Sequence, residues 1–66
     1  MTINVNNQKQ IISENSSIDF LLEELSLSKN GIAIAINNQI ITKDTWSDTI
    51  VKVNDDVTII RATQGG

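Results

Sequence analysis

The residues with the clearest capacity for chemistry are the last three, Gln64, Gly65 and Gly66. A C-terminal carboxylate is ionised at neutral pH, so it can act as a nucleophile. Two consecutive glycines leave the adjoining backbone free of any Cβ that would limit its dihedral angles. A Gly-Gly ending is expected by chance in roughly one chain in 200. We therefore interpret this ending as a reactive terminus, with a flexible tail or a cloning remnant as the alternative.

The composition of the 66-residue chain excludes most other kinds of reactive or binding site. It contains no Cys and no His, which excludes a disulfide scaffold, thiolate or histidine metal sites, and Ser-His or Cys-His nucleophiles. Five basic and eight acidic residues give a net charge of −3, so the chain lacks the basic surface that binds nucleic acid or anionic lipid. This inventory predicts no catalytic site and no bound cofactor or metal.

The length and hydropathy indicate one small soluble domain. Its N-terminus has no basic cluster followed by an apolar run, and the longest apolar stretch, 32–36, is far shorter than the roughly 20 residues of a membrane helix. We expect a domain over residues 1–62 and a diglycine tail over 63–66. We also expect a monomer in the bacterial cytoplasm, or in an organellar stroma if the chain is plastid-encoded.

The first half of the sequence predicts a hairpin and a helix. Alternating apolar and polar residues predict a strand over 2–6, and a second short strand follows over 9–13 after a turn at Asn6-Asn7-Gln8. Ser17 is a suitable N-cap, and the spacing of the next apolar residues gives one helix face: Ile18, Leu21, Leu22 and Leu25. We expect this helix to end within 26–29, with a left-handed stop at Asn30-Gly31.

The second half predicts three more strands. They span 31–37, 39–42 and 57–62, with a turn at Asn37-Asn38, a helical turn over 43–48 that buries Trp46, and a solvated turn at Asp55-Asp56. The last strand is too far from its predecessor to form a hairpin, so we expect it beside the first strand. The economical packing is a two-layer α+β domain. Its predicted core is Ile3, Val5, Leu21, Leu22, Leu25, Ile34, Ile36, Val57 and Ile59.

Three parts of this pattern resemble the ThiS family of sulfur carriers of thiamine biosynthesis: segment 31–39, Trp46 and segment 54–66. The resemblance implies the ubiquitin-like β-grasp fold, with one main helix on a five-strand mixed sheet of order 2-1-5-3-4. It implies that an activating enzyme uses ATP to adenylate the Gly66 carboxylate, which then becomes a thiocarboxylate. Gln64, Gly65 and Gly66 would thread into partner active sites.

The same resemblance implies three partners: the adenylating enzyme, a thiazole synthase that takes the sulfur, and a sulfur donor supplied by a cysteine desulfurase. This chain departs from the family at two turns, with Asn37-Asn38 in place of Asn-Gly and Asn54-Asp55 in place of Gly-Asp. Asn is the best substitute for Gly in a left-handed conformation, so we expect the fold to be kept.

In the implied sheet order, four apolar residues share the face away from the helix: Ala33, Ala35, Ile60 and Ala62. We predict a docking surface there, with incidental small residues on a solvated sheet as the alternative. Two alternatives for the function also remain. One is a molybdopterin-type sulfur carrier or a ubiquitin-like modifier, and the other is a β-grasp interaction module whose diglycine is incidental.

Overall fold

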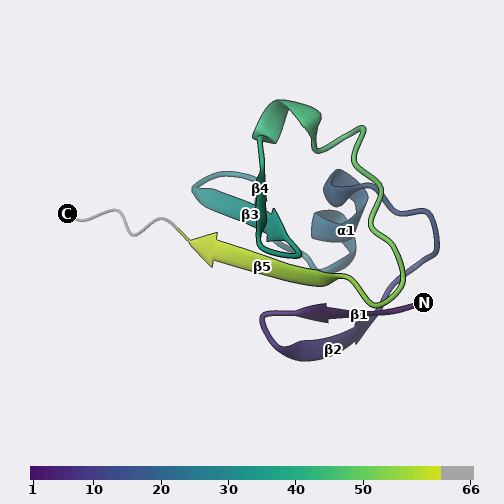
Figure 1. The fold of residues 1–66 in the computed structure, drawn as a ribbon. Helices are drawn as coiled ribbons and strands as arrows, with labels where there is room; N and C mark the ends of the chain where they lie inside the picture. Colours follow the sequence, from purple (N-terminus) through teal and green to yellow (C-terminus); the bar gives the residue numbers. More distant parts are fainter. Residues whose placement is uncertain (62–66) are drawn as a thin grey trace.

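A computed structural model describes residues 1–61 (Figure 1). The elements are β1 (Thr2–Val5), β2 (Gln8–Ile11), α1 (Ile18–Glu24), β3 (Ile32–Ile36), β4 (Gln39–Ile41), a 3₁₀ turn (Lys43–Thr45) and β5 (Asp56–Arg61). The five strands form one sheet of order β2-β1-β5-β3-β4. β1 and β5 are parallel and every other neighbouring pair is antiparallel. The predicted sheet order, with the last strand central, is therefore confirmed.

Asparagine forms both tight hairpin turns. Asn6 and Asn7, between β1 and β2, have φ angles of 51° and 66°, and Asn37 and Asn38, between β3 and β4, have 51° and 69°. Two consecutive left-handed residues give the primed turn that matches the twist of a two-residue hairpin. Asn54, before β5, is also left-handed, with φ of 66°. Asn therefore adopts the required backbone at both departures from the family pattern.

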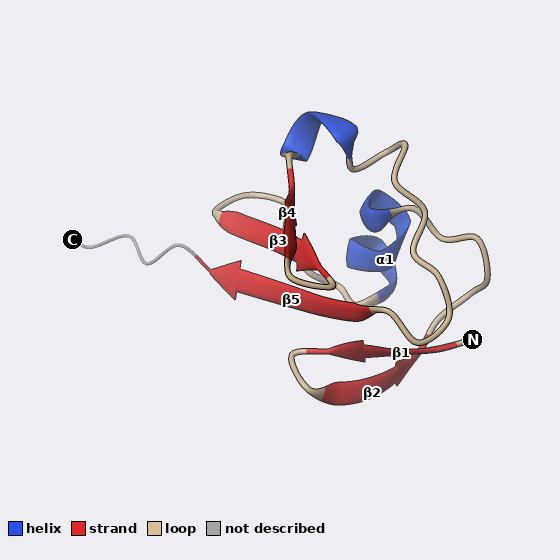
Figure 2. Ribbon diagram, viewed as in Figure 1, coloured by secondary structure: helices blue, strands red, loops and turns tan. Residues whose placement is uncertain are grey.

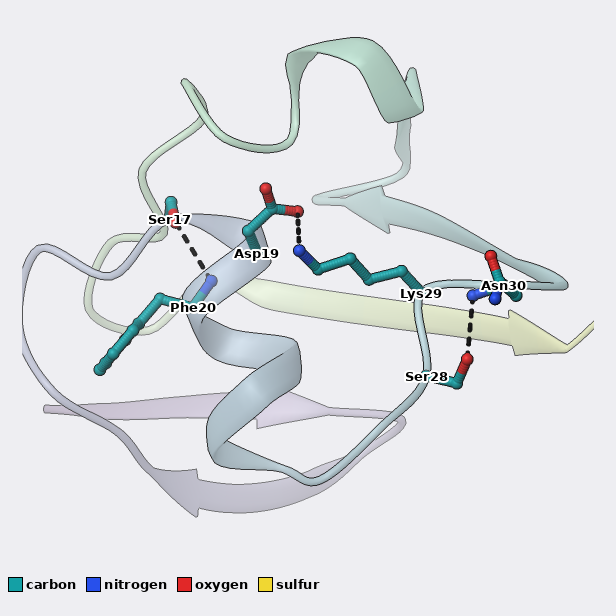
Figure 3. A network of polar contacts seen from close by, with 6 residues as sticks. All are labelled: Ser17, Asp19, Phe20, Ser28, Lys29 and Asn30. Atoms are coloured by element: carbon teal, nitrogen blue, oxygen red, sulfur yellow. Dashed lines mark hydrogen bonds and ion pairs between the residues drawn. The ribbon is translucent and has the colours of Figure 1, made fainter.

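The start of α1 is capped as the sequence predicts. The Ser17 hydroxyl accepts a hydrogen bond from the Phe20 amide at 3.1 Å (Figure 3). Asp19 lies in the first turn, where the positive end of the helix dipole favours a carboxylate. Its Oδ1 also lies 3.5 Å from Nζ of Lys29, in the loop after the helix. This ion pair joins the first turn of α1 to the segment that leads into β3.

The end of α1 differs from the prediction. The helix stops at Glu24, and the left-handed residue that ends it is Ser26, with φ of 58°. The amide of Leu27 donates to the Leu22 carbonyl at 2.9 Å, and the amide of Ser26 donates to the Glu23 carbonyl at 3.0 Å. This pair of bonds defines a Schellman motif, which satisfies the last carbonyls of the helix. Gly31 is also left-handed, but it serves the entry into β3.

The core lies between α1 and one face of the sheet (Figure 2). Its buried members are Ile3, Val5, Ile12, Ile18, Leu21, Leu22, Ile34, Ile36, Trp46, Val51 and Val57. The predicted core members Leu25 and Ile59 are only partly buried against this cluster. Trp46 is 2% exposed and donates from Nε1 to the Ile41 carbonyl at 2.9 Å, so its polar atom is satisfied. Within residues 1–61, no helix is long and apolar enough to cross a bilayer.

The prediction of a fully solvated Asp55-Asp56 turn is wrong for Asp55. This residue is half-buried, and its Oδ2 accepts from the Lys52 amide at 2.8 Å. Its Oδ1 accepts from Nδ2 of Asn37 at 3.2 Å, while Oδ1 of Asn37 accepts from the Asp56 amide at 3.0 Å. Asp55 therefore fixes the turn before β5 against the β3–β4 hairpin, which sets where the central strand begins.

Candidate functional site

The sheet face opposite α1 carries an apolar area over β5, β3 and β4. Ala33 pairs with Ile60 in the register of β3 and β5, and Ala35 pairs with Ile40 of β4. Because side chains alternate along a strand, these four point away from the core. Ile60 is 50% exposed and Ile40 is 66% exposed. We call Ala33, Ile40 and Ile60 the outer patch.

The prediction for the docking surface needs one correction and one addition. Ala35 is only 8% exposed, so it offers little surface for docking although it lies on the predicted face. Its neighbours across the sheet, Ile40 on β4 and Thr58 on β5, carry larger side chains. Ile40 belongs to the patch, and the sequence analysis missed it. The alternation of Ile40 and Ile41 within a short strand was the available signal, since only one of them can face the core.

The C-terminal half of β5 leads from this patch towards the chain terminus. Arg61, the last described residue, is exposed and pairs with Ile32 of β3. On the helix side, a shallow groove of about 400 Å³ lies at this end of the strand, with Leu27, Ile32 and Ile59 among its walls. The described end of β5 is therefore flanked by apolar side chains on both sheet faces.

Beyond the end of β1, the side chain of Asn6 is hydrogen-bonded to the backbone of β5. Oδ1 of Asn6 accepts from the Ile59 amide at 2.8 Å, and Nδ2 of Asn6 donates to the Ile59 carbonyl at 3.3 Å. The backbone amide of Asn6 also donates to the Val57 carbonyl at 2.9 Å. The amide side chain thus takes the place of the next peptide group in the parallel ladder. The sequence analysis assigned Asn6 only to a turn and missed this contact.

The remaining predicted site residues, Ala62, Gln64, Gly65 and Gly66, lie outside the described residues. Over residues 1–61, no cluster of three or more acidic side chains is placed to hold a metal ion. The described part of the site is thus an exposed apolar area on the open sheet face and a central strand, β5, whose last described residue is Arg61.

Comparison with known proteins identifies the family. The model of the ThiS family matches residues 1–66, the whole chain. This chain belongs to the ThiS family. The sulfur carrier protein ThiS of Escherichia coli strain K12 is 32% identical over 66 residues, which is 100% of both chains.

Two solved structures share the fold of this chain. The crystal structure of the thiamine biosynthesis protein ThiS from Geobacter metallireducens gives a TM-score of 0.87 over 100% of both chains, at 22% identity. An NMR structure of a thiamine biosynthesis protein from the same organism gives 0.80, over 100% of this chain and 88% of the other. The five-strand sheet on one helix is thus the β-grasp architecture of ThiS proteins.

Proposed function

We propose that this chain is a sulfur carrier of thiamine biosynthesis that acts as a protein co-substrate. The observation that carries the proposal is the match to the ThiS family over all 66 residues, on a chain that ends in Gly65-Gly66. The full-length similarity to the sulfur carrier of E. coli supports the same role. Because the chain contains no Cys, its C-terminal carboxylate is the group available to hold sulfur.

The proposed chemistry begins at Gly66. A carboxylate oxygen attacks the α-phosphorus of ATP in an adenylating enzyme, and pyrophosphate leaves. In the net second step, persulfide sulfur from a cysteine desulfurase, reduced to the level of sulfide by two thiols that become a disulfide, attacks the acyl carbon, and AMP leaves with the original carboxylate oxygen. The product is a thiocarboxylate in which sulfur replaces one oxygen, and a thiazole synthase takes that sulfur.

The fold supports this role by fixing the strand that precedes the terminal glycines in the sequence. β5 is the central strand: β3 pairs with it as far as Arg61, while β1 and then the Asn6 side chain hold its other side as far as Ile59. The outer patch lies beside its last residues and offers apolar area for a partner to bury. The missing Cβ atoms of Gly65 and Gly66 allow a narrow channel to close around the terminal backbone.

Intact-mass spectrometry tests the proposal directly. The chain is incubated with the ThiS-activating enzyme of the same genome, MgATP and inorganic sulfide. We expect a mass increase equal to the replacement of one oxygen by sulfur, confined to the C-terminal peptide, and no increase without ATP. An unchanged mass, under conditions in which the enzyme converts an established carrier, would remove the sulfur-carrier role and favour a β-grasp interaction module.

The same product separates the thiamine role from the molybdopterin alternative. The purified thiocarboxylate form is offered to thiazole synthase and, in parallel, to molybdopterin synthase apo-subunit. We expect the mass to return to that of the carboxylate form only with thiazole synthase and its substrates. Turnover only in the molybdopterin reaction would reassign the pathway and leave the carrier chemistry intact.

A further inference from the structure

Although β5 is the central strand, the side of it that faces β1 is unpaired with any strand at its C-terminal end. β1 pairs with β5 only at Asp56 and Val57, whereas β3 pairs with β5 as far as Arg61. β5 therefore continues past the end of β1, as Figure 1 shows. Beyond the Asn6 side chain, no strand of residues 1–61 covers the β1 side of β5. We call this uncovered stretch at Arg61 the β5 edge.

The direction of the backbone groups follows from the alternation along β5. The carbonyls of Asp55 and Val57 accept from β1 and Asn6, and the amide and carbonyl of Ile59 both bond the Asn6 side chain. The Asp56 carbonyl instead accepts from Asn37, on the β3 side. Odd-numbered residues thus turn their polar groups to the β1 side, so the amide and carbonyl of Arg61 point to the β5 edge.

An unpaired strand edge is a template for one more strand. Its row of N–H and C=O groups is complemented by the backbone of an extended segment, and peptides bind sheets in this way by β-strand addition. The Asn6 side chain stops the pairing with β1 at Ile59, and the chain then turns back into β2. The available partner for Arg61 is therefore an extended segment of another molecule.

The length of the tail limits which molecule that is, and the adenylating enzyme is the first proposed partner that must receive Gly66. Five residues follow Arg61, and fully extended they reach at most about 18 Å. Any active site that receives the Gly66 carboxylate consequently brings its wall within that distance of Arg61. A segment of that wall is the one that meets the β5 edge when the outer patch is docked.

We infer that the β5 edge at Arg61 binds an extended segment of the adenylating enzyme by strand addition, and that this pairing aligns the tail with the active site. The inference rests on the proposed function. The contacts are made by the backbone, so they fix the direction and register of the tail without requiring a particular side chain at position 61. The exposed apolar patch would supply binding area, and the strand edge would supply alignment.

Two substitutions at one position separate the backbone from the side chain. R61A removes the guanidinium and keeps the amide N–H, whereas R61P also removes the N–H. Proline is tolerated at a strand edge where its missing N–H faces away from the sheet, and this N–H has no partner in β3 or β1. Melting of both variants shows whether the fold is kept. We expect R61P to bind the adenylating enzyme, in the presence of MgATP, about tenfold more weakly than R61A.

Amide hydrogen exchange gives a second measurement that needs no variant. In the free protein the Arg61 amide should exchange quickly, while that of Ile59 is slowed by Asn6. In the complex with the adenylating enzyme, the Arg61 amide should become protected. Equal affinities of folded R61P and R61A, or an Arg61 amide that stays unprotected in the complex, would overturn the strand-addition inference.

The failure of this inference is distinct from the failure of the proposed function. If the parent chain gains sulfur but the Arg61 amide stays unprotected, the carrier role stands and strand addition is wrong. If the parent chain is never adenylated, the proposed function fails, and the inference built on it fails as well.

Discussion

Asn6 and Ile59, 53 positions apart in the sequence, are joined by two hydrogen bonds between one side-chain amide and one peptide unit. Asn6 Oδ1 accepts from the Ile59 amide and Asn6 Nδ2 donates to its carbonyl. The same Asn6 is left-handed, with φ of 51°, and starts the turn to β2. One residue thus follows the end of β1 and secures β5, the strand that precedes the terminal glycines in the sequence.

The contribution of this contact can be measured against a neighbouring residue. Asn7 has a similar left-handed backbone, with φ of 66°, and its side chain makes no hydrogen bond within residues 1–61. Asn6→Ala and Asn7→Ala should share the backbone strain, but only the first loses the contact with Ile59. We predict that Asn6→Ala lowers the free energy of unfolding by about 1–2 kcal/mol more than Asn7→Ala. Equal losses in urea denaturation would show that the contact adds nothing to stability.

The helix face makes a prediction about the core. Leu22 is fully buried, whereas Leu25 at the end of α1 is only partly buried. Leu22→Ala should lower the free energy of unfolding by about 2–5 kcal/mol, because it removes apolar contacts and leaves a cavity. Leu25→Ala should cost clearly less. The fluorescence of Trp46, buried in the same cluster, reports unfolding, and an unchanged midpoint for Leu22→Ala would contradict this packing.

The end of α1 offers a stabilising substitution. Ser26 is left-handed, with φ of 58°, a conformation that disfavours residues with a Cβ. Ser26→Gly relieves this strain, although glycine gains entropy in the unfolded chain, so we predict a net gain of up to about 1 kcal/mol. Ser28→Gly is the control, because the Ser28 hydroxyl accepts from the Asn30 amide and that bond would be lost. A lower melting temperature for Ser26→Gly would contradict the cap assignment.

The outer patch is tested by a charge at Ile60. Ile60→Asp places a carboxylate beside Ala33, on a face expected to lose water in the complex. Ile50→Asp is a matched control, because Ile50 is 45% exposed against 50% for Ile60 but lies outside the sheet, in the loop before β5. We predict at least about tenfold weaker binding of the adenylating enzyme for Ile60→Asp only. Calorimetry that finds both variants equal to the parent would place the docking surface elsewhere.

The terminal glycines should matter for chemistry and hardly at all for stability. The described core lies wholly before Ala62, so deletion of Gly66 should leave the melting temperature nearly unchanged. The deletion moves the carboxylate back by one residue, about 3.3–3.6 Å, which is too far for in-line attack on ATP. ATP–pyrophosphate exchange should fall by orders of magnitude.

Gly65→Val tests the same site by another route, because a branched side chain restricts the backbone and adds bulk in the channel. It too should keep the melting temperature and lose exchange. Exchange at the parent rate with either variant would show that the terminus is not the reacting group.

Local sequence determined the elements and their turns. The alternation in Ile3-Asn4-Val5 and in 32–36 produces strands, and Ser17 caps the helix, because these features depend on neighbours in the chain. Paired asparagines produce both hairpin turns for the same reason, since they accept positive φ without help from the rest of the fold. The sequence likewise predicts a reacting terminus at Gly65-Gly66, which lies outside the described residues.

Only the tertiary structure decided the contacts between distant segments. Periodicity predicts that Ala35 lies on the sheet face away from the helix, but it could not predict that this residue is buried there. Its neighbours in the sheet, Ile40 and Thr58, come from other strands. Nor could periodicity place Val51 in the core, since that residue belongs to no regular element. The open edge at Arg61 arises from the stagger between β1 and β3 along β5, a register that packing and the Asn6 contact set. Local residue preferences do not predict the register between two strands, because hydrogen-bonding partners far apart in sequence meet only in the assembled sheet.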